Sequence, residues 1–155
     1  MTKLTILTAT LTLCLLSACA TYTPPVEKDF AKTKIINTSY DQAWEKATEW
    51  FANGNVPIKN IAKDSGLIAT DYKLRASSRD IDCGTLGQMD AFQNKRANMN
   101  IFIKEVSPTS VSVSINVFGN AIVTTMAGSA YATSKDVECV STGSLEKSIL
   151  DAVKQ

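Results

Sequence analysis

Cysteine and histidine are the residue types that most directly limit what chemistry this chain can perform. The sequence holds four cysteines and no histidine. Because histidine is the commonest general base and transition-metal ligand, its absence excludes Ser-His-Asp and Cys-His catalytic arrangements and histidine-based zinc sites. Gly-x-Ser-x-Gly, phosphate-loop and dinucleotide-binding motifs are also missing. We therefore expect no catalytic residue, no cofactor and no bound metal.

The N-terminal residues are typical of an export signal that ends at a lipid attachment site. Lys3 precedes an apolar stretch from Leu4 to Leu16, which is too short to span a bilayer. This stretch ends in Leu16-Ser17-Ala18-Cys19, which resembles the lipobox of bacterial lipoproteins. The resemblance implies removal of residues 1–18 as a signal peptide, diacylglycerol on the Cys19 sulfur, and N-acylation, for example with palmitate. The alternative is an ordinary secretory signal that is cut nearby.

The residues after Cys19 indicate where the chain resides and how it is attached. Ala20, in place of aspartate, implies sorting to the periplasmic face of the outer membrane if the host is Gram-negative. Ala20 to Lys32 is polar, contains Pro24 and Pro25, and has no periodicity. We expect residues 19–32 to be a lipidated cysteine with a flexible tether, and residues 33–155 to be one domain.

The charge balance limits the class of partner. The chain has 16 basic and 15 acidic side chains, and Lys3 lies in the signal, so 16 − 1 = 15 basic residues balance 15 acidic residues in the mature chain. A nucleic-acid binder would show a basic patch or stripe. We therefore expect no nucleic-acid partner.

Two cysteines, Cys83 and Cys139, remain in the mature domain once Cys14 leaves with the signal and Cys19 carries lipid. An exported protein occupies an oxidising compartment, so we expect these two residues to form a disulfide. A redox-active pair is the alternative, although no Cys-x-x-Cys motif is present.

The hydrophobic pattern predicts an α+β domain. Ser39, with Gln42 three residues on, begins a helix whose apolar face carries two tryptophans, and Asn53-Gly54-Asn55 ends it. We expect short strands at 34–39, 58–62 and 67–72, and a hairpin of 97–106 with a strand over 111–117. Residues 121–126 and 129–133 continue as strands or as a looser excursion, and Thr142 or Ser144 caps a last helix. The predicted fold is one twisted antiparallel sheet with two helices packed on one face.

The segment from Lys73 to Arg96 is a long polar stretch without clear periodicity, and we expect it to be a loop. Its basic residues are candidates for contact with phosphate, lipid A or an acidic partner; these are Lys73, Arg75, Arg79, Lys95 and Arg96. The alternative is a solvated loop in which neighbouring aspartates balance those charges. The same aspartates could ligate calcium, but the EF-hand spacing is absent.

One motif resembles a known family. Ser39-Tyr40-Asp41-x-Ala43-Trp44-x-x-Ala47, a glycine turn, and Asp64-x-Gly66-x-Ile68-x-Thr70-x-Tyr72 resemble the helix-grip domains of bacterial lipoproteins. Such domains occur in the C subunit of the outer-membrane β-barrel assembly machine and in small lipoproteins built on a single unit. The match covers about residues 35–72. The resemblance implies a helix-grip-like fold and an accessory role in the cell envelope.

These observations favour a non-enzymatic interaction module that is anchored by lipid and binds an envelope protein. The alternative is a carrier or sensor of a small apolar or glycan ligand between helix and sheet. A cavity lined by Trp44, Trp50, Phe51 or Phe118 would favour that alternative. A hydrolase is the least favoured class, because histidine and the catalytic motifs are missing.

Overall fold

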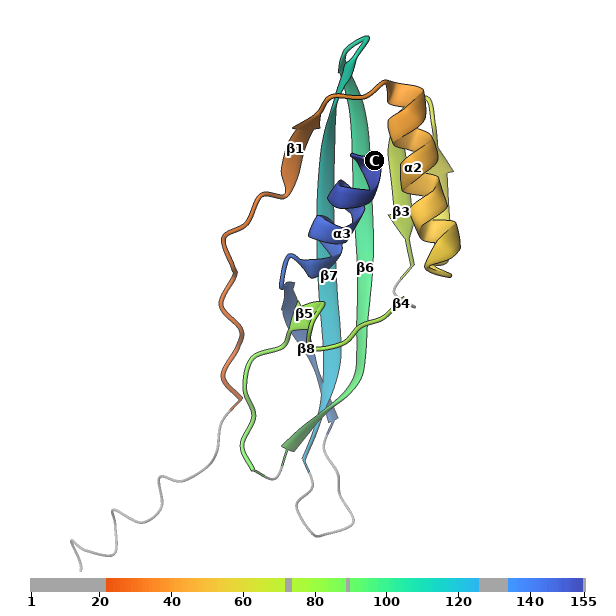
Figure 1. The fold of residues 1–155 in the computed structure, drawn as a ribbon. Coiled ribbons are helices and arrows are strands. Elements are labelled where there is room, and N and C mark those ends of the chain that lie inside the picture. The colour runs from red at the N-terminus through yellow and green to blue at the C-terminus, as the bar shows by residue number, and fades with distance from the viewer. Residues whose placement is uncertain (1–21, 72–73, 89, 126–133, 155) are drawn as a thin grey trace, which may run out of the picture.

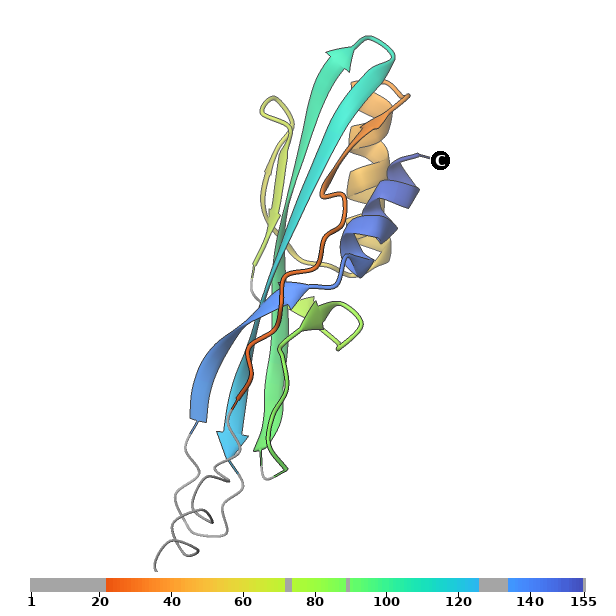
Figure 2. The same cartoon turned by 90° about the vertical axis from the view of Figure 1, so that its left-hand side faces the viewer.

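A computed structural model describes residues 22–71, 74–88, 90–125 and 134–154. Within these residues the chain forms one antiparallel sheet with two helices on one face, as predicted (Figure 1). The signal residues 1–18 and Cys19 lie outside the described residues. Figure 2 shows the two helices side by side on the same side of the sheet, and no helix within the described residues covers the opposite face.

The sheet is built around one long hairpin. β6 (Asp90–Ser107) and β7 (Ser110–Thr125) pair along almost their whole length. On the outer side of β6 lie β3 (Leu67–Thr70) and β4 (Leu74–Arg75), and β2 (Ile58–Ala62) pairs with β3. On the outer side of β7 lie β1 (Thr33–Ile36) and β8 (Ser134–Ser141), and β5 (Ile81–Asp82) pairs with β8.

The helices cover the face on which the apolar side chains of the hairpin lie. α2 (Tyr40–Asn53) begins at Ser39, whose hydroxyl accepts a hydrogen bond from the Gln42 amide in the predicted capping box. Asn55, rather than Gly54, takes the left-handed conformation after this helix. α3 (Ser144–Val153) packs beside α2 and against β7. Its N-cap is Gly143, with φ of 85°, and neither Thr142 nor Ser144 occupies that position as expected.

Alternation from Ala97 to Ile103 of β6 and along β7 separates a buried face from an exposed face. On the buried face lie Met99, Ile101 and Ile103 of β6 and Val111, Val113 and Ile115 of β7. They pack against Ala43, Trp44, Ala47 and Phe51 of α2 and against Ile149 and Val153 of α3. This side-chain packing fills the space between helices and sheet.

One expectation about the strands is corrected, one is confirmed in part, and one strand was missed. The stretch from residue 73 to 96 is not one long loop, because it contains β4, β5 and the first residues of β6. Residues 121–125 continue β7 without interruption, whereas 129–133 lie outside the described residues. β8 was not expected, and it carries Cys139 into the sheet beside β7.

Candidate interaction surface

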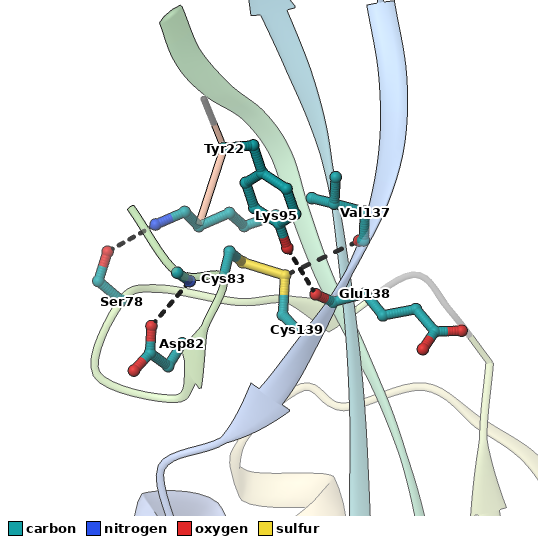
Figure 3. The surroundings of a disulfide bond; sticks show 9 residues. Tyr22, Ser78, Asp82, Cys83, Lys95, Val137, Glu138 and Cys139 are labelled. Atoms are coloured by element: carbon teal, nitrogen blue, oxygen red, sulfur yellow. Dashed lines mark hydrogen bonds between the residues drawn. A yellow bond between two sulfur atoms is a disulfide. The ribbon is translucent and has the colours of Figure 1, made fainter. Parts of the chain in front are cut away.

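Cys83 and Cys139 form the expected disulfide. Cys83 directly follows β5 and Cys139 lies in β8, and their Cα atoms are 4.2 Å apart. Both residues are buried, so the bond joins the 77–88 segment to the sheet from within the core. Figure 3 shows Tyr22 and Lys95 beside the bond. Burial, and then the charges of Asp82 and Glu138, raise the pKa of the Tyr22 phenol.

The N-terminal segment Tyr22–Lys32 is not a flexible tether in this structure. The backbones of Thr23 and Thr85 exchange two hydrogen bonds of 3.0 Å. The Lys28 amino group lies 3.5 Å from the Asp82 carboxylate, and the Lys32 carbonyl accepts a hydrogen bond of 2.8 Å from Ile115. These contacts correct the tether expectation for residues 22–32, which run along the sheet edge toward β1 (Figures 1 and 2).

Tyr22 and Phe30 anchor the two ends of the same segment. The Tyr22 ring meets Phe92 edge to face at 6.4 Å, and its hydroxyl donates to the Glu138 carbonyl at 3.5 Å. Phe30 lies against Gly143, where a β-carbon would approach the ring to 3.0 Å. Through Tyr22 the N-terminal segment contacts β6 and β8. Through Phe30 it contacts the start of α3, because Gly143 is the N-cap of that helix.

The structure divides the basic candidates between two faces of the sheet. Arg75 in β4 lies directly opposite Arg96 in β6, so these two side chains share one face. The Lys95 side chain lies on the other face. Its amino group donates a hydrogen bond of 2.7 Å to the Ser78 hydroxyl and lies 5.2 Å from the centre of the Phe92 ring. Arg79 is exposed in the turn after Ser77, and its carbonyl accepts a hydrogen bond from Thr142. Lys73 lies outside the described residues.

Arg75 and Arg96 form an unusual cross-strand pair. Like charges directly opposite each other in a sheet are destabilising. Neither arginine side chain forms an ion pair or hydrogen bond with any residue in the described part of the chain. Together with Ala76, Asn94 and Lys95 they line a shallow pocket at the sheet edge. Two exposed, uncompensated guanidinium groups of this kind are suited to bind carboxylate or phosphate.

The aspartates near these arginines have structural partners. Asp80 accepts hydrogen bonds from the Ser77 amide at 2.8 Å and the Ser77 hydroxyl at 2.6 Å, which closes the turn before β5. Asp82 accepts from the Gly84 amide at 2.9 Å and faces Lys28. Within the described residues no group of three His, Cys, Asp or Glu side chains could hold a metal ion.

The face of the sheet turned away from the helices carries exposed apolar side chains. We call it the outer face, and the register assigns to it Ile35 of β1, Arg75 of β4, Arg96, Asn98, Asn100, Phe102 and Lys104 of β6, Ser112, Ser114, Asn116, Phe118 and Asn120 of β7, and Asp136 and Glu138 of β8. Ile35 is 60% exposed, Phe118 48% and Phe102 43%. Large apolar side chains gathered on one exposed face are typical of an interaction surface.

A pocket of about 660 Å³ opens on the outer face where the N-terminal segment passes β7 and β8. Phe118, Asn120 and Val140 contribute to its lining, and Glu27, Asp136 and Glu138 add carboxylates. This pocket contains Phe118, one of the aromatic residues named for a ligand cavity, but it does not lie between helix and sheet. Trp44 and Phe51 are buried in the core, and Trp50 donates its indole hydrogen to Ser148 at 3.0 Å.

Glu146 is a buried charged residue that the sequence analysis did not single out. It is 1% exposed, and its Oε2 accepts a hydrogen bond of 2.8 Å from the Ser141 hydroxyl. The same hydroxyl oxygen accepts from the Gly143 amide at 3.1 Å. Two hydrogen bonds through the Ser141 hydroxyl therefore connect the Glu146 carboxylate to the Gly143 amide at the N-terminus of α3. The sequence feature that could have indicated this residue is an acidic side chain at the third position after Gly143, the N-cap of α3.

Comparison of the chain with protein-family models, with curated proteins and with solved structures finds no match in any of the three. The resemblance to helix-grip lipoproteins therefore rests on the sequence motif over residues 35–72. Within the described residues, no helix is long and apolar enough to cross a membrane.

Proposed function

We propose that this chain is a bacterial lipoprotein, anchored through Cys19 to the periplasmic face of the outer membrane, that acts as a non-enzymatic interaction module of the cell envelope. The observation that carries the proposal is the outer face, where Ile35, Phe102 and Phe118 are exposed beside unpaired charges. Such a surface is suited to hold a partner protein, because aromatic residues and arginine are enriched at protein–protein interfaces.

The proposed attachment is supported by the lipobox-like sequence Leu16-Ser17-Ala18-Cys19 and by the position of Cys19 relative to the domain. Ala20 and Thr21 alone separate Cys19 from Tyr22, the first residue that the structure describes. Two acyl groups or more provide stable anchoring, whereas one chain binds a membrane only marginally. An absence of histidine and of catalytic motifs from the sequence supports a role in binding rather than in catalysis.

Photo-cross-linking in intact cells tests this proposal. A photoreactive amino acid is placed at Phe102 on the outer face and, as the matched control, at Glu49 on the exposed side of α2. Each variant is made with Cys19 intact and with Cys19→Ser. We expect one discrete envelope-protein adduct at position 102, no such adduct at position 49, and loss of the adduct together with membrane attachment in Cys19→Ser.

Two results would contradict the proposal. If Cys19→Ser fractionates with the membrane as the unchanged chain does, then Cys19 is not the anchor. If positions 102 and 49 yield the same mixture of abundant envelope proteins, then the outer face is not a specific interaction surface.

A further inference from the structure

Charges on the outer face are separated by sign. Arg75 and Arg96 lie on the β4–β6 side, and Asp136 and Glu138 lie on β8. The register places Arg96 opposite Asn120 and Asn120 opposite Glu138. The basic Arg96 and the acidic Glu138 therefore flank Asn120 of β7 on its two sides. None of these four charged residues has an ion-pair partner in the described part of the chain.

Both sides are hollowed, the acidic side by the larger pocket and the basic side by the pocket of about 550 Å³ beside Arg75 and Arg96. The pocket of about 660 Å³ combines the apolar surfaces of Phe118 and Val140 with the carboxylates of Asp136 and Glu138. Its third carboxylate, Glu27, is paired with Lys32 at 2.7 Å. An arginine side chain suits this pocket, because its methylene groups pack on apolar surface while the guanidinium meets carboxylates and an aromatic face.

We propose that the partner held by the outer face is a second copy of this chain, which packs face to face with the first in a self-complementary dimer interface. The two-fold axis runs parallel to the strands and passes over Phe118 in β7. Rotation about such an axis keeps each residue at its height and exchanges the two sides of β7. It therefore brings Arg96 of each copy onto Glu138 of the other, with Arg75 beside it, and places the two Phe118 side chains together.

The remaining charges on this face do not oppose the arrangement. Lys104 lies near the far end of β6, opposite Ser112 in its own chain, and the same rotation places it over Ile35 of the second copy. Isologous contacts of this kind, in which the same patch serves both copies, are the commonest way in which soluble proteins form dimers.

The size of the face is sufficient for a stable pair. β6, β7 and β8 hold 18, 16 and 8 residues. At about 4.8 Å per strand and about 3.3 Å per residue, these three strands alone give roughly 650 Å² per copy. The shorter strands beside them bring the face to about the 800 Å² that one partner contributes to a standard interface.

The direction of the axis agrees with attachment to a membrane, and this part of the inference rests on the proposed lipid anchor. Both N-terminal segments leave the sheet at the same end when the axis is parallel to the strands, so that both copies can be anchored in one bilayer. The pairing of the faces themselves does not require the anchor.

Charge exchange between two differently tagged copies tests the proposal. In one variant the basic side is reversed by Arg75→Glu and Arg96→Glu, and in the other the acidic side is reversed by Asp136→Arg and Glu138→Arg. Full-length chains are co-expressed in pairs, extracted in mild detergent and purified through one tag. Reversing both residues on a side makes the test insensitive to a small shift of the axis across the hairpin.

We expect unchanged copies to co-purify, and each variant to co-purify with itself at least about tenfold less, because every cross-copy contact becomes repulsive. A mixture of the two variants should restore co-purification, since all cross-copy contacts are then attractive. Rescue by mixing cannot come from contacts within one chain. The control pair Arg79→Glu and Lys135→Glu alters charges outside this face and should leave co-purification unchanged.

The proposal is overturned if unchanged copies do not co-purify, if the self-paired variants co-purify as well as the unchanged chain, or if mixing does not restore association. Circular dichroism of each variant identifies loss of folding, and the mixed pair must be formed from folded chains. The result is independent of the anchoring test, because association is measured in detergent and anchoring by fractionation of Cys19→Ser.

Discussion

Gly84 is the residue at which the disulfide segment and the N-terminal segment come closest. Its φ of 85° is one that side chains rarely adopt, and a β-carbon there would lie 2.1 Å from the Thr23 carbonyl oxygen. Gly84→Ala should therefore open the bridge between Thr23 and Thr85 and lower the free energy of unfolding by about 1–2 kcal/mol. Urea unfolding measures the loss, and trypsin should cut faster after Lys28 and Lys32.

Thr85→Ala is the control for that prediction, because the bridge uses backbone atoms and the Thr85 side chain is exposed. If both variants are cut at the same rate as the unchanged chain, then Gly84 does not hold the N-terminal segment in place.

The hydrogen bond between Ser141 and Glu146 gives a second prediction at the residue scale. Ser141→Ala removes the described hydrogen-bond donor to the carboxylate of Glu146, which is 1% exposed. The other oxygen of Glu146, Oε1, already lacks a partner within the described residues. We expect a loss of about 1–3 kcal/mol in urea unfolding. Ser141→Ala combined with Glu146→Leu should recover part of that loss, because the buried carboxylate is then removed while the Gly143 amide still lacks the Ser141 oxygen. A double variant less stable than Ser141→Ala alone would contradict this account.

Local signals explain which residues the sequence predicted well. Ser39 and Gln42 form a capping box from neighbours in the chain, and Cys83 and Cys139 are the two cysteines in the expected domain, so each had one candidate partner there. Glu146 could not be predicted, because glutamate is almost never fully buried and nothing beside it in the sequence indicates Ser141 as its partner. Arg75 and Arg96 were named as candidates, but their direct opposition depends on the pairing of β4 with β6.

At the scale of elements, segments with a regular hydrophobic period were predicted from the sequence, and segments without one were missed. The middle of β6, from Ala97 to Ile103, and the facing part of β7 alternate regularly, and their buried face followed from that pattern. β4 and β5 have two residues each and exist because distant strands pair with them, so no local period could indicate them. The segment 22–32 has no period either, and its contacts with Thr85, Ile115 and Gly143 come from far along the chain.

The disulfide gives a prediction for the elements that it joins. It closes a loop with a sequence separation of 56 between β5 and β8. Replacing both cysteines by Cys83→Ser and Cys139→Ser should lower the free energy of unfolding by about 2–4 kcal/mol, because the unfolded chain gains freedom. Urea unfolding under oxidising conditions measures this. The unchanged chain with its disulfide reduced should lose a similar amount, and equal stability of all three forms would exclude a structural role.

The N-terminal segment should also respond to pH through Glu27. The hydrogen bond from Lys32, and then its charge, hold the pKa of the Glu27 carboxyl below its ordinary value. A lowered folded-state pKa means that the stabilisation is present above the unfolded-state pKa and is lost as pH falls through the folded-state pKa. The urea midpoint of the unchanged chain should therefore exceed that of Glu27→Gln at about pH 7, and the difference should vanish by about pH 3.

Because Glu27 is exposed at the surface, we expect this difference to be small and to shrink in high salt. A difference that stays constant from neutral to acidic pH would show that Glu27 does not act through its charge.

For the whole molecule, the short link between Cys19 and Tyr22 determines how the domain stands on a membrane. β6 has 18 residues, which corresponds to a length of roughly 60 Å at about 3.4 Å per residue. Ala20 and Thr21 extend at most about 10 Å from Cys19 to Tyr22. If the proposed anchor is correct, the Gln88 end of the sheet lies close to the bilayer, and the turn at Thr109 lies far from it.

A fluorescent amino acid placed at Gln88 or at Thr109 measures this arrangement in the lipidated, full-length chain reconstituted in vesicles. Both positions are exposed, so neither label disturbs the core. A quencher on the lipid headgroups should quench the label at position 88 strongly and the label at position 109 weakly. About twenty glycine and serine residues inserted after Thr21 should remove the difference, because a flexible linker of that length spans roughly 25 Å. Equal quenching at both positions without the insertion would mean that the sheet lies flat on the membrane, and the upright arrangement of two anchored copies would then be wrong.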